Sequence, residues 1–188
     1  MVADFKYAPK VPEPFRCRVP LPDTHEVIVT NGEFREEFFS LDENVLTITR
    51  RKGGIKKNGA VEHAQGEESK RGYFVEVKEE CKVDETIQII GVRDGSGDEA
   101  IEFVNGVKLG TDSIAKLLIC NHTLTTDRFE TEEAFDIDLG PGAQLDMVVM
   151  QNEHNKAAHK TKFNISLRGG ARLKIVIDRK STRLNSSH

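Results

Sequence analysis

The sequence predicts an all-β chain whose core is a right-handed parallel β-helix, a solenoid in which each coil contributes two strands. From residue 72 onward, short apolar runs alternate with turn residues, and no stretch holds a 3.6-residue period. Residues 135–139 and 163–167 share one apolar alternation at a spacing of 28 residues, which indicates a repeat architecture. Only 37% of residues are hydrophobic and 6% are aromatic, a content that suits a narrow interior filled layer by layer. An antiparallel sandwich or barrel is the competing fold, because short strands at this spacing also allow it.

Residues 1–41 are expected to form an irregular N-terminal entry segment. Five prolines between positions 9 and 22 interrupt regular structure there. A strand is predicted over residues 26–30, followed by Asn31-Gly32 and then Glu33 and Phe34. Asn-Gly is the preferred pair for a two-residue hairpin turn, so a short hairpin is predicted at this point.

Residues 42–71 are predicted to be a polar connector loop that begins with a strand over residues 45–49. Basic residues gather after that strand and could form an anion-binding patch. Acidic residues follow them, and no aromatic side chains are interleaved for base stacking. A solvated loop is therefore favoured. The basic residues are Arg50, Arg51, Lys52, Lys56 and Lys57.

Residues 72–177 are predicted to be the β-helix core. Alternate residues such as Ala143, Leu145, Met147 and Val149 should point to one face of their strand. Matching positions in successive coils would then stack into a continuous apolar core. Strands are predicted over residues 73–77, 86–92, 101–104, 114–120, 134–139, 143–150, 163–167 and 171–177.

The repeat also predicts how the coils align. Ala115, Ala143 and Ala171 recur at intervals of 28 residues, with Ile87 one period upstream. We expect these positions to stack, with alanine at the narrow corner where each strand begins. The segments 140–142 and 169–170 are glycine-rich and should form the turns before that corner, because glycine adopts positive φ readily.

Residues 178–188 resemble the in-frame translation of a common sequencing adapter. We therefore expect this tail to be non-native and the natural sequence to be cut short at Ile177, and we leave the tail out of the functional interpretation. A solenoid whose last coil is uncapped exposes apolar interior and unpaired backbone groups. The 188-residue chain is accordingly predicted to self-associate.

Charge and cysteine content restrict the function classes. The net charge is −4, with 27 basic and 31 acidic residues, which argues against a nucleic-acid binder and against polybasic attachment to a membrane. The three cysteines, Cys17, Cys81 and Cys120, lie far apart and form no CxxC pair. This pattern favours a reducing compartment, and the N-terminus lacks a signal-peptide pattern. A cytoplasmic location is the expectation.

Cys120 and His122 are weak candidates for a metal site. Two residues apart on a strand, they would share a face, and a thiolate with an imidazole could supply half of a metal site. A stable zinc or cluster site needs about four ligands. A buried cysteine beside a turn histidine is the favoured interpretation.

Glu153, His154 and His159 could suggest metal binding or acid–base chemistry. Their spacing is not that of an HExxH motif. Residues 151–155 are instead predicted to be a polar coil edge or a surface that faces a partner.

Four aspartates could be interpreted as glycosidase carboxylates, because many β-helices cleave polysaccharides. Such enzymes need two carboxylates that converge, and two of these four alternate with apolar residues as on the solvent face of a strand. A solvent-facing role is favoured. The four residues are Asp84, Asp136, Asp138 and Asp146.

Two segments resemble a known family. LLICNHTL at residues 117–124 is similar to the LVCDHTL segment of SufD proteins, and VMQNEHNK at residues 149–156 is similar to their ELQNEHNKS segment. The resemblance covers roughly residues 5–41 and 72–177 and is most specific over 115–156. The paralogue SufB resembles the chain less, because it usually has EGCSAP and TVQNW at these two places. The chain is thus identified as resembling the SufB/SufD family of iron–sulfur cluster assembly proteins.

The resemblance implies a non-catalytic scaffold with a right-handed β-helix core flanked by helical parts. It implies a complex with SufB and the ATPase SufC, which builds an iron–sulfur cluster from persulfide sulfur and iron. The chain alone is not expected to bind a cofactor. The family's docking region for SufC and its interface histidine both lie beyond residue 177, so neither is carried over. The alternatives are a secreted β-helix enzyme acting on polysaccharide and a free-standing β-helix binding module.

Overall fold

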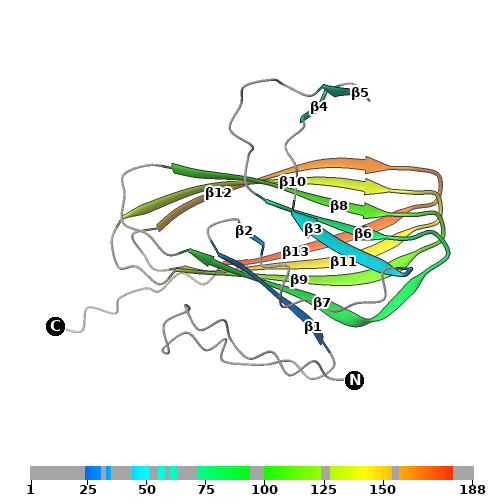
Figure 1. Ribbon diagram of the computed structural model, residues 1–188, viewed down its shortest axis with the longest axis horizontal. Helices are drawn as coiled ribbons and strands as arrows, with labels where there is room; N and C mark the ends of the chain where they lie inside the picture. Colours follow the sequence, from blue (N-terminus) through cyan, green and yellow to red (C-terminus); the bar gives the residue numbers. More distant parts are fainter. Residues whose placement is uncertain are drawn as a thin grey trace.

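The structure is a computed structural model, and it describes residues 24–30, 33–34, 44–50, 55–57, 60–62, 72–93, 100–123, 128–153 and 157–179. Cys17, His154 and residues 180–188 lie outside this described part. Every regular element among the described residues is a β-strand. Two layers of strands face each other along the length of the molecule (Figure 1).

The lower layer in Figure 1, called sheet A here, has six strands in the order β13-β11-β9-β7-β1-β2. The upper layer, sheet B, has five in the order β12-β10-β8-β6-β3. Sheet A consists of β1 (Thr24–Thr30), β2 (Glu33–Phe34), β7 (Lys82–Arg93), β9 (Ile114–Thr123), β11 (Gln144–Asn152) and β13 (Arg172–Arg179). Sheet B consists of β3 (Leu46–Arg50), β6 (Tyr73–Val77), β8 (Ala100–Leu109), β10 (Phe129–Leu139) and β12 (Ala157–Leu167).

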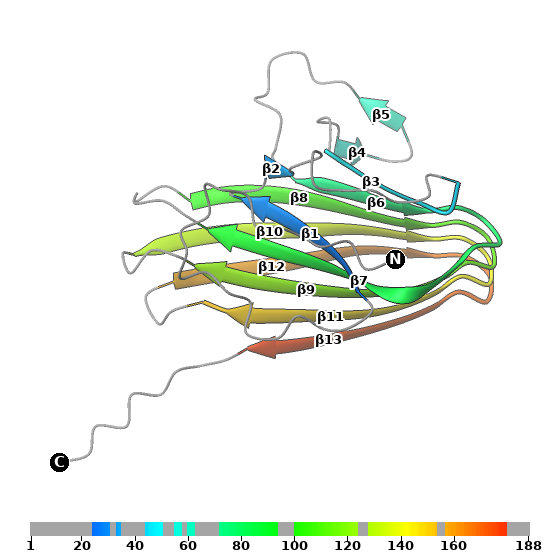
Figure 2. The same ribbon diagram turned by 60° about the horizontal axis from the view of Figure 1, so that its bottom comes forward.

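From β6 onward the chain alternates between the two sheets, and every pair formed among these strands is parallel. Each strand therefore pairs with the strand two elements away in sequence rather than with its direct successor. This arrangement confirms the predicted parallel β-helix and excludes the antiparallel sandwich for this region. Figure 2 shows the strands of both sheets running to one shared end, where short turns join β6 to β7, β8 to β9, β10 to β11 and β12 to β13.

Antiparallel pairs among the described residues occur only toward the N-terminal side. β1 pairs with β2 as the Asn31-Gly32 signal predicted, and β3 pairs with β6. The connector predicted as a loop contains a short antiparallel pair, β4 (Ile55–Lys57) with β5 (Ala60–Glu62). At the other boundary, β13 continues beyond the predicted limit at Ile177, because Asp178 and Arg179 pair with Met150 and Gln151.

The space between the sheets is filled by inward-facing side chains from both. Ala143, Leu145, Met147 and Val149 are each at most 2% exposed, which confirms the predicted alternation on this strand. Sheet B contributes the matching layer, in which the Phe135 ring stacks on Phe163 of the next coil at a centroid distance of 5.4 Å. Burial of this aliphatic and aromatic surface is the main source of stability for the solenoid.

The short turns share one backbone conformation. Glu80, Asp112, Gly142 and Gly170 hold positive φ angles of 57°, 53°, 71° and 75°. In the last two turns, the residue after the positive-φ glycine closes the turn with its backbone N–H. Ala143 N donates to Gly140 O at 3.1 Å, and Ala171 N donates to Arg168 O at 2.8 Å. The predicted turns at 140–142 and 169–170 are confirmed. We call this end of the solenoid the turn end.

The predicted alignment of the coils is wrong for all but the last one. Leu145 pairs with Leu173 at the expected spacing of 28 residues, but it pairs with Ala115 at a spacing of 30. Ile87 likewise pairs with Leu117 and not with Ala115. The corner position before Ala143 in the stack is Ser113, which is fully buried. The error escapes detection in the sequence because a shift of two residues keeps every side chain on the same face of its strand.

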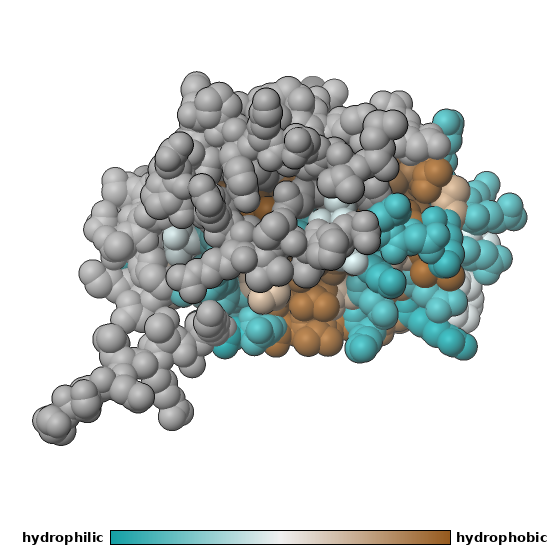
Figure 3. Space-filling view, turned by 90° about the horizontal axis from the view of Figure 1, so that it is seen from below, coloured by the Kyte–Doolittle hydropathy of each residue, from teal (hydrophilic) through white to brown (hydrophobic). Residues whose placement is uncertain are grey.

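The opposite end, called the loop end here, is where β7, β9 and β11 end and where β8, β10 and β12 begin. The outer face of sheet A carries polar side chains around an apolar patch (Figure 3). Leu118, Val148 and Val176 lie in one register row across β9, β11 and β13, and Val176 is 43% exposed.

Candidate functional site

The two weak metal candidates, Cys120 and His122, lie two residues apart on β9, on the outer side of sheet A. Cys120 is 5% exposed, with Sγ 3.9 Å from Gln88 Nε2. His122 Nδ1 lies 3.3 Å from Asn152 Nδ2. Burial lowers the pKa of His122, and the charge of Glu153 offsets only part of that shift. Among the described residues no group of three or more histidines, cysteines and carboxylates could hold a metal ion. Cys81 lies at the turn end, with Sγ 3.9 Å from Asn44 O.

The four candidate aspartates are divided between the two sheets. Asp84 pairs with Lys82 at 2.6 Å on sheet A, where both side chains are exposed. On sheet B, Asp136 accepts a hydrogen bond from Asn164 Nδ2 at 2.7 Å, and Asp138 pairs with Arg168 at 3.2 Å. Asp146 is an exposed residue of β11. The fold does not bring these carboxylates together at one site.

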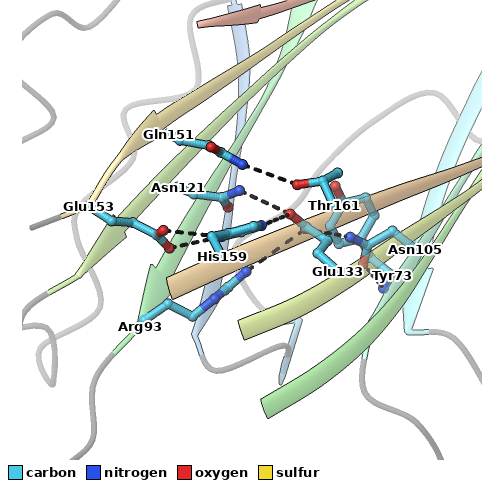
Figure 4. Close-up of polar contacts among 9 residues, drawn as sticks. All are labelled: Tyr73, Arg93, Asn105, Asn121, Glu133, Gln151, Glu153, His159 and Thr161. Atoms are coloured by element: carbon cyan, nitrogen blue, oxygen red, sulfur yellow. Dashed lines mark hydrogen bonds and ion pairs between the residues drawn. The ribbon is translucent and has the colours of Figure 1, made fainter. Parts of the chain in front are cut away.

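The structure instead brings charged residues together inside the solenoid, near the loop end. Arg93, Glu133, Glu153 and His159 come from four different strands or strand ends and point into the space between the sheets (Figure 4). Their side chains are between 1% and 7% exposed. With the neighbouring amides Asn105 and Asn121, these residues are called the polar cluster here.

Glu133 on β10 is the centre of the polar cluster. Its Oε1 accepts a hydrogen bond from Asn105 Nδ2 at 2.7 Å, and its Oε2 accepts one from Asn121 Nδ2 at 3.0 Å. Arg93 Nη2 lies 3.9 Å from Oε1. Burial raises the pKa of the Glu133 carboxyl, but the nearby His159, Arg93 and Asn121 outweigh it and the net pKa is lowered. The carboxylate is therefore charged inside the protein.

His159 on β12 lies between two carboxylates. Its Nδ1 is 3.1 Å from both carboxylate oxygens of Glu153, and its Nε2 is 3.2 Å from Glu133 Oε2. The Nε2 contact is an ion pair and not a hydrogen bond. Burial lowers the pKa of His159, but the two carboxylates outweigh it and raise the pKa to about 9. At neutral pH the ring is thus an imidazolium with a carboxylate at each nitrogen.

Arg93 at the end of β7 completes the charge balance. Its guanidinium carbon lies 4.0 Å from the centroid of the Phe103 ring, within the range of a cation–π interaction. Burial lowers the pKa of Arg93, while Glu133 and Glu153 oppose that shift. Arginine stays protonated in proteins. Two cations, Arg93 and His159, therefore face two anions, Glu133 and Glu153.

Smaller polar contacts extend the polar cluster along the interior. Asn105 Oδ1 accepts a hydrogen bond from the Tyr73 backbone N–H at 3.3 Å. Gln151 Nε2 donates to Thr161 Oγ1 at 3.1 Å between the two sheets. These contacts join β6, β8, β10 and β12 of sheet B to β7, β9 and β11 of sheet A. The arrangement holds the sheets together through matched charges and amides rather than presenting reactive groups at the surface.

Residues 151–155 were predicted to form a polar edge or a partner-facing surface. Asn152 is exposed, as this predicts, but Gln151 and Glu153 turn inward, and the prediction is wrong for these two. Gln151 is 8% exposed and the Glu153 side chain 7% exposed. They continue the inward alternation of Leu145, Met147 and Val149. The overlooked signal was the parity of these positions, which places odd-numbered residues of β11 inside. Glu133 and His159 carry the same signal on β10 and β12.

Comparison with known proteins adds no relative. No protein-family model, no curated protein and no solved structure matches the chain. Within the described part of the chain, no helix has the length and apolar character needed to cross a membrane.

Proposed function

We propose that the chain is a SufD-like scaffold that holds SufB and SufC in the cytoplasm while an iron–sulfur cluster is assembled as the cargo of the complex. One observation supports this most directly. Residues 117–123 and 149–152, which belong to the two segments that resemble SufD proteins, lie on the adjacent strands β9 and β11, where Cys120 pairs with Met150 and His122 with Asn152. Segments that carry one family resemblance thus form one continuous structural unit.

The same two segments also supply side chains to the polar cluster. Asn121 donates to Glu133, and Glu153 pairs with His159. Charged side chains from both sheets pair in the interior, and each of them contacts groups on other coils. Such pairing is expected to make the solenoid a rigid platform. A scaffold acts through its shape and surface, so it needs no open site for a substrate. This interpretation explains why the charged residues are buried and paired.

Co-purification tests the proposal. The tagged full-length gene product would be expressed with SufB and SufC, because the family's docking region for SufC is expected beyond residue 177. An unrelated β-solenoid of similar size carrying the same tag is the matched control. We expect SufB, SufC or both to be recovered with the chain and neither with the control. Recovery of neither partner by the folded full-length product would contradict the proposal. Release of sugar from a polysaccharide by the purified chain would favour the alternative of a β-helix enzyme.

A further inference from the structure

Three side chains that line one small cavity inside the solenoid hold polar atoms that have no hydrogen-bond partner among the described residues. These atoms are the Tyr73 hydroxyl, Nε and Nη1 of Arg93, and Oδ1 of Asn121. All three residues are at most 3% exposed. A buried polar group without a partner costs roughly 1–3 kcal/mol, and native proteins leave few of them. A bound molecule that pairs with these atoms would remove that cost.

The orientation of Asn121 is set by its neighbour. Nδ2 donates to the Glu133 carboxylate at 3.0 Å, and exchanging the two amide atoms would place an oxygen against that carboxylate. Oδ1 must therefore point the other way, toward Gly91. A side chain added at Gly91 would collide with Asn121 Oδ1 and would come within 3.3 Å of Arg93 Nη1. The acceptor on Asn121 and the donor on Arg93 thus face the same space beside Gly91.

This space is a small cavity of about 10 Å³. A cavity needs roughly 10–15 Å³ on this scale to hold one water molecule. Its polar lining combines donors and acceptors, and Phe103 with neighbouring aliphatic side chains closes the remainder. The polar residues that line it are Tyr73, Arg93, Asn105, Asn121 and Glu133.

The lining selects a neutral ligand with both donor and acceptor capacity. An anion would face the Glu133 carboxylate and Asn121 Oδ1, both of which repel negative charge. A cation would face the guanidinium of Arg93, which has no acceptor to offer. A water molecule can accept from Arg93, donate to Asn121 Oδ1 and pair with the Tyr73 hydroxyl, which matches the about three hydrogen bonds typical of a buried water.

We propose that a single ordered water molecule occupies the cavity beside Gly91 and joins Arg93, Asn121 and Tyr73. A larger residue at position 91 would collide with Asn121 Oδ1, one of the atoms that bind this water, and would therefore disturb the water's site. The water would exchange slowly with bulk solvent, since it lies between two packed sheets. This inference is independent of the proposed scaffold function.

A crystal structure of the full chain at a resolution that shows ordered water is the direct test. We expect one electron-density peak in the cavity, within hydrogen-bond distance of the Arg93 guanidinium and Asn121 Oδ1. The absence of a peak would overturn the proposal. So would a peak with the anomalous signal of a bromide ion after crystals are grown in bromide, since that would identify an anion site.

Magnetic relaxation dispersion of water oxygen-17 gives a second test in solution, because it counts internal waters that exchange slowly. Gly91→Ala should lose the signal of one such water relative to the wild-type chain. Gly169→Ala is the matched control, because nothing lies within 4 Å of a Cβ added there, and it should lose none. An unchanged signal in folded Gly91→Ala would contradict the proposal. If circular dichroism shows that this variant does not fold, the crystal structure decides the question.

Discussion

The interior of the solenoid is apolar near the turn end and polar near the loop end, although the same strands build both halves. On β10, the inward residues Phe135, Ile137 and Leu139 are at most 2% exposed and pack in the apolar core. Toward the loop end the next inward residues are Glu133 and Thr131, which are equally buried. The comparison shows that a side chain facing inward in this fold need not be apolar. It needs a packing, hydrogen-bond or ion-pair partner in the neighbouring coil.

The two halves should respond differently to substitution because different forces hold them. In the apolar half, stabilisation follows the buried area and the quality of packing. In the polar half, burial of charge costs free energy that only the matched partners recover. Removing one partner there leaves the others buried and uncompensated. The following predictions test this difference, from the largest expected effect to the smallest.

Glu133→Gln should have the largest effect. The substitution keeps the shape of the side chain but leaves Arg93 and His159 without their shared carboxylate. Breaking a buried ion pair in this way costs about 3–5 kcal/mol of the free energy of unfolding, measured by urea denaturation. Glu132→Gln is the matched control, because this neighbour lies on the exposed face and pairs with Lys160, and it should cost less than about 1 kcal/mol. Equal effects of the two variants would contradict the comparison.

Ile137→Ala probes the apolar half. Ile137 is 2% exposed and belongs to the core cluster, so its truncation should leave a cavity and lower the free energy of unfolding by about 3 kcal/mol. The same denaturation experiment measures it, and the effect should not depend on pH between 6.5 and 9. A strong pH dependence of this difference would show that the two halves are not separable.

The pH dependence of stability is a property of the polar half. The pKa of His159 is raised from 6.5 to about 9 in the folded protein, so its contribution is fully present below pH 6.5 and is lost as the pH rises through about 9. At about 1.4 kcal/mol per pKa unit, this contribution is at most about 3 kcal/mol. Glu133, whose pKa is lowered, acts in the opposite direction, and its contribution is lost as the pH falls below its ordinary value.

Urea denaturation across this pH interval measures the effect. His159→Gln should abolish the decline in stability between pH 6.5 and 9 and should lower stability at the acidic end of that interval. A wild-type stability that stays constant up to pH 9 would show that the imidazolium does not form.

Gly142→Ala tests the turn end. Gly142 has φ of 71°, and a side chain there would also collide with Asp112. A residue with a Cβ in this conformation costs about 1–2 kcal/mol, although Glu80 and Asp112 show that the fold accepts such residues in other coils. Gly169→Ala, which has open space around its added methyl, should change the unfolding free energy by less than about 0.5 kcal/mol. The reverse order would contradict the assignment of the turn.

The last coil should affect association more than stability. Inward-facing Ile165, Leu167 and Ile177 are 49%, 49% and 52% exposed, because no further described coil covers them. We expect the chain to self-associate in sedimentation velocity and Leu167→Lys to raise the monomer fraction while lowering the unfolding free energy by less than about 1 kcal/mol. Asn164→Lys on the outer face of the same strand is the control and should leave association unchanged. A monodisperse wild-type monomer would contradict this prediction.

Much of the fold could be predicted from the sequence. The alternation of Leu145, Met147 and Val149 and the glycines at 142 and 170 have local causes, namely the two-residue period of a strand and the positive φ of a turn. The family resemblance and the scaffold function stay predictions. The sequence analysis considered Glu153 and His159 together, because they lie six residues apart. Their burial against Glu133 and Arg93 could not be predicted, because those two partners are distant in the sequence.

The sequence by itself determined which side chains of each strand face inward, because that depends only on parity along the strand. Only the tertiary structure decided how the coils align. The residues with positive φ at the turns follow one another at intervals of 32, 30 and 28 residues, and an alternating pattern is unchanged by a shift of two. That alignment places His159 between Glu133 and Glu153. Contacts between coils depend on the number of residues in each whole coil, and a local sequence pattern does not reveal that number.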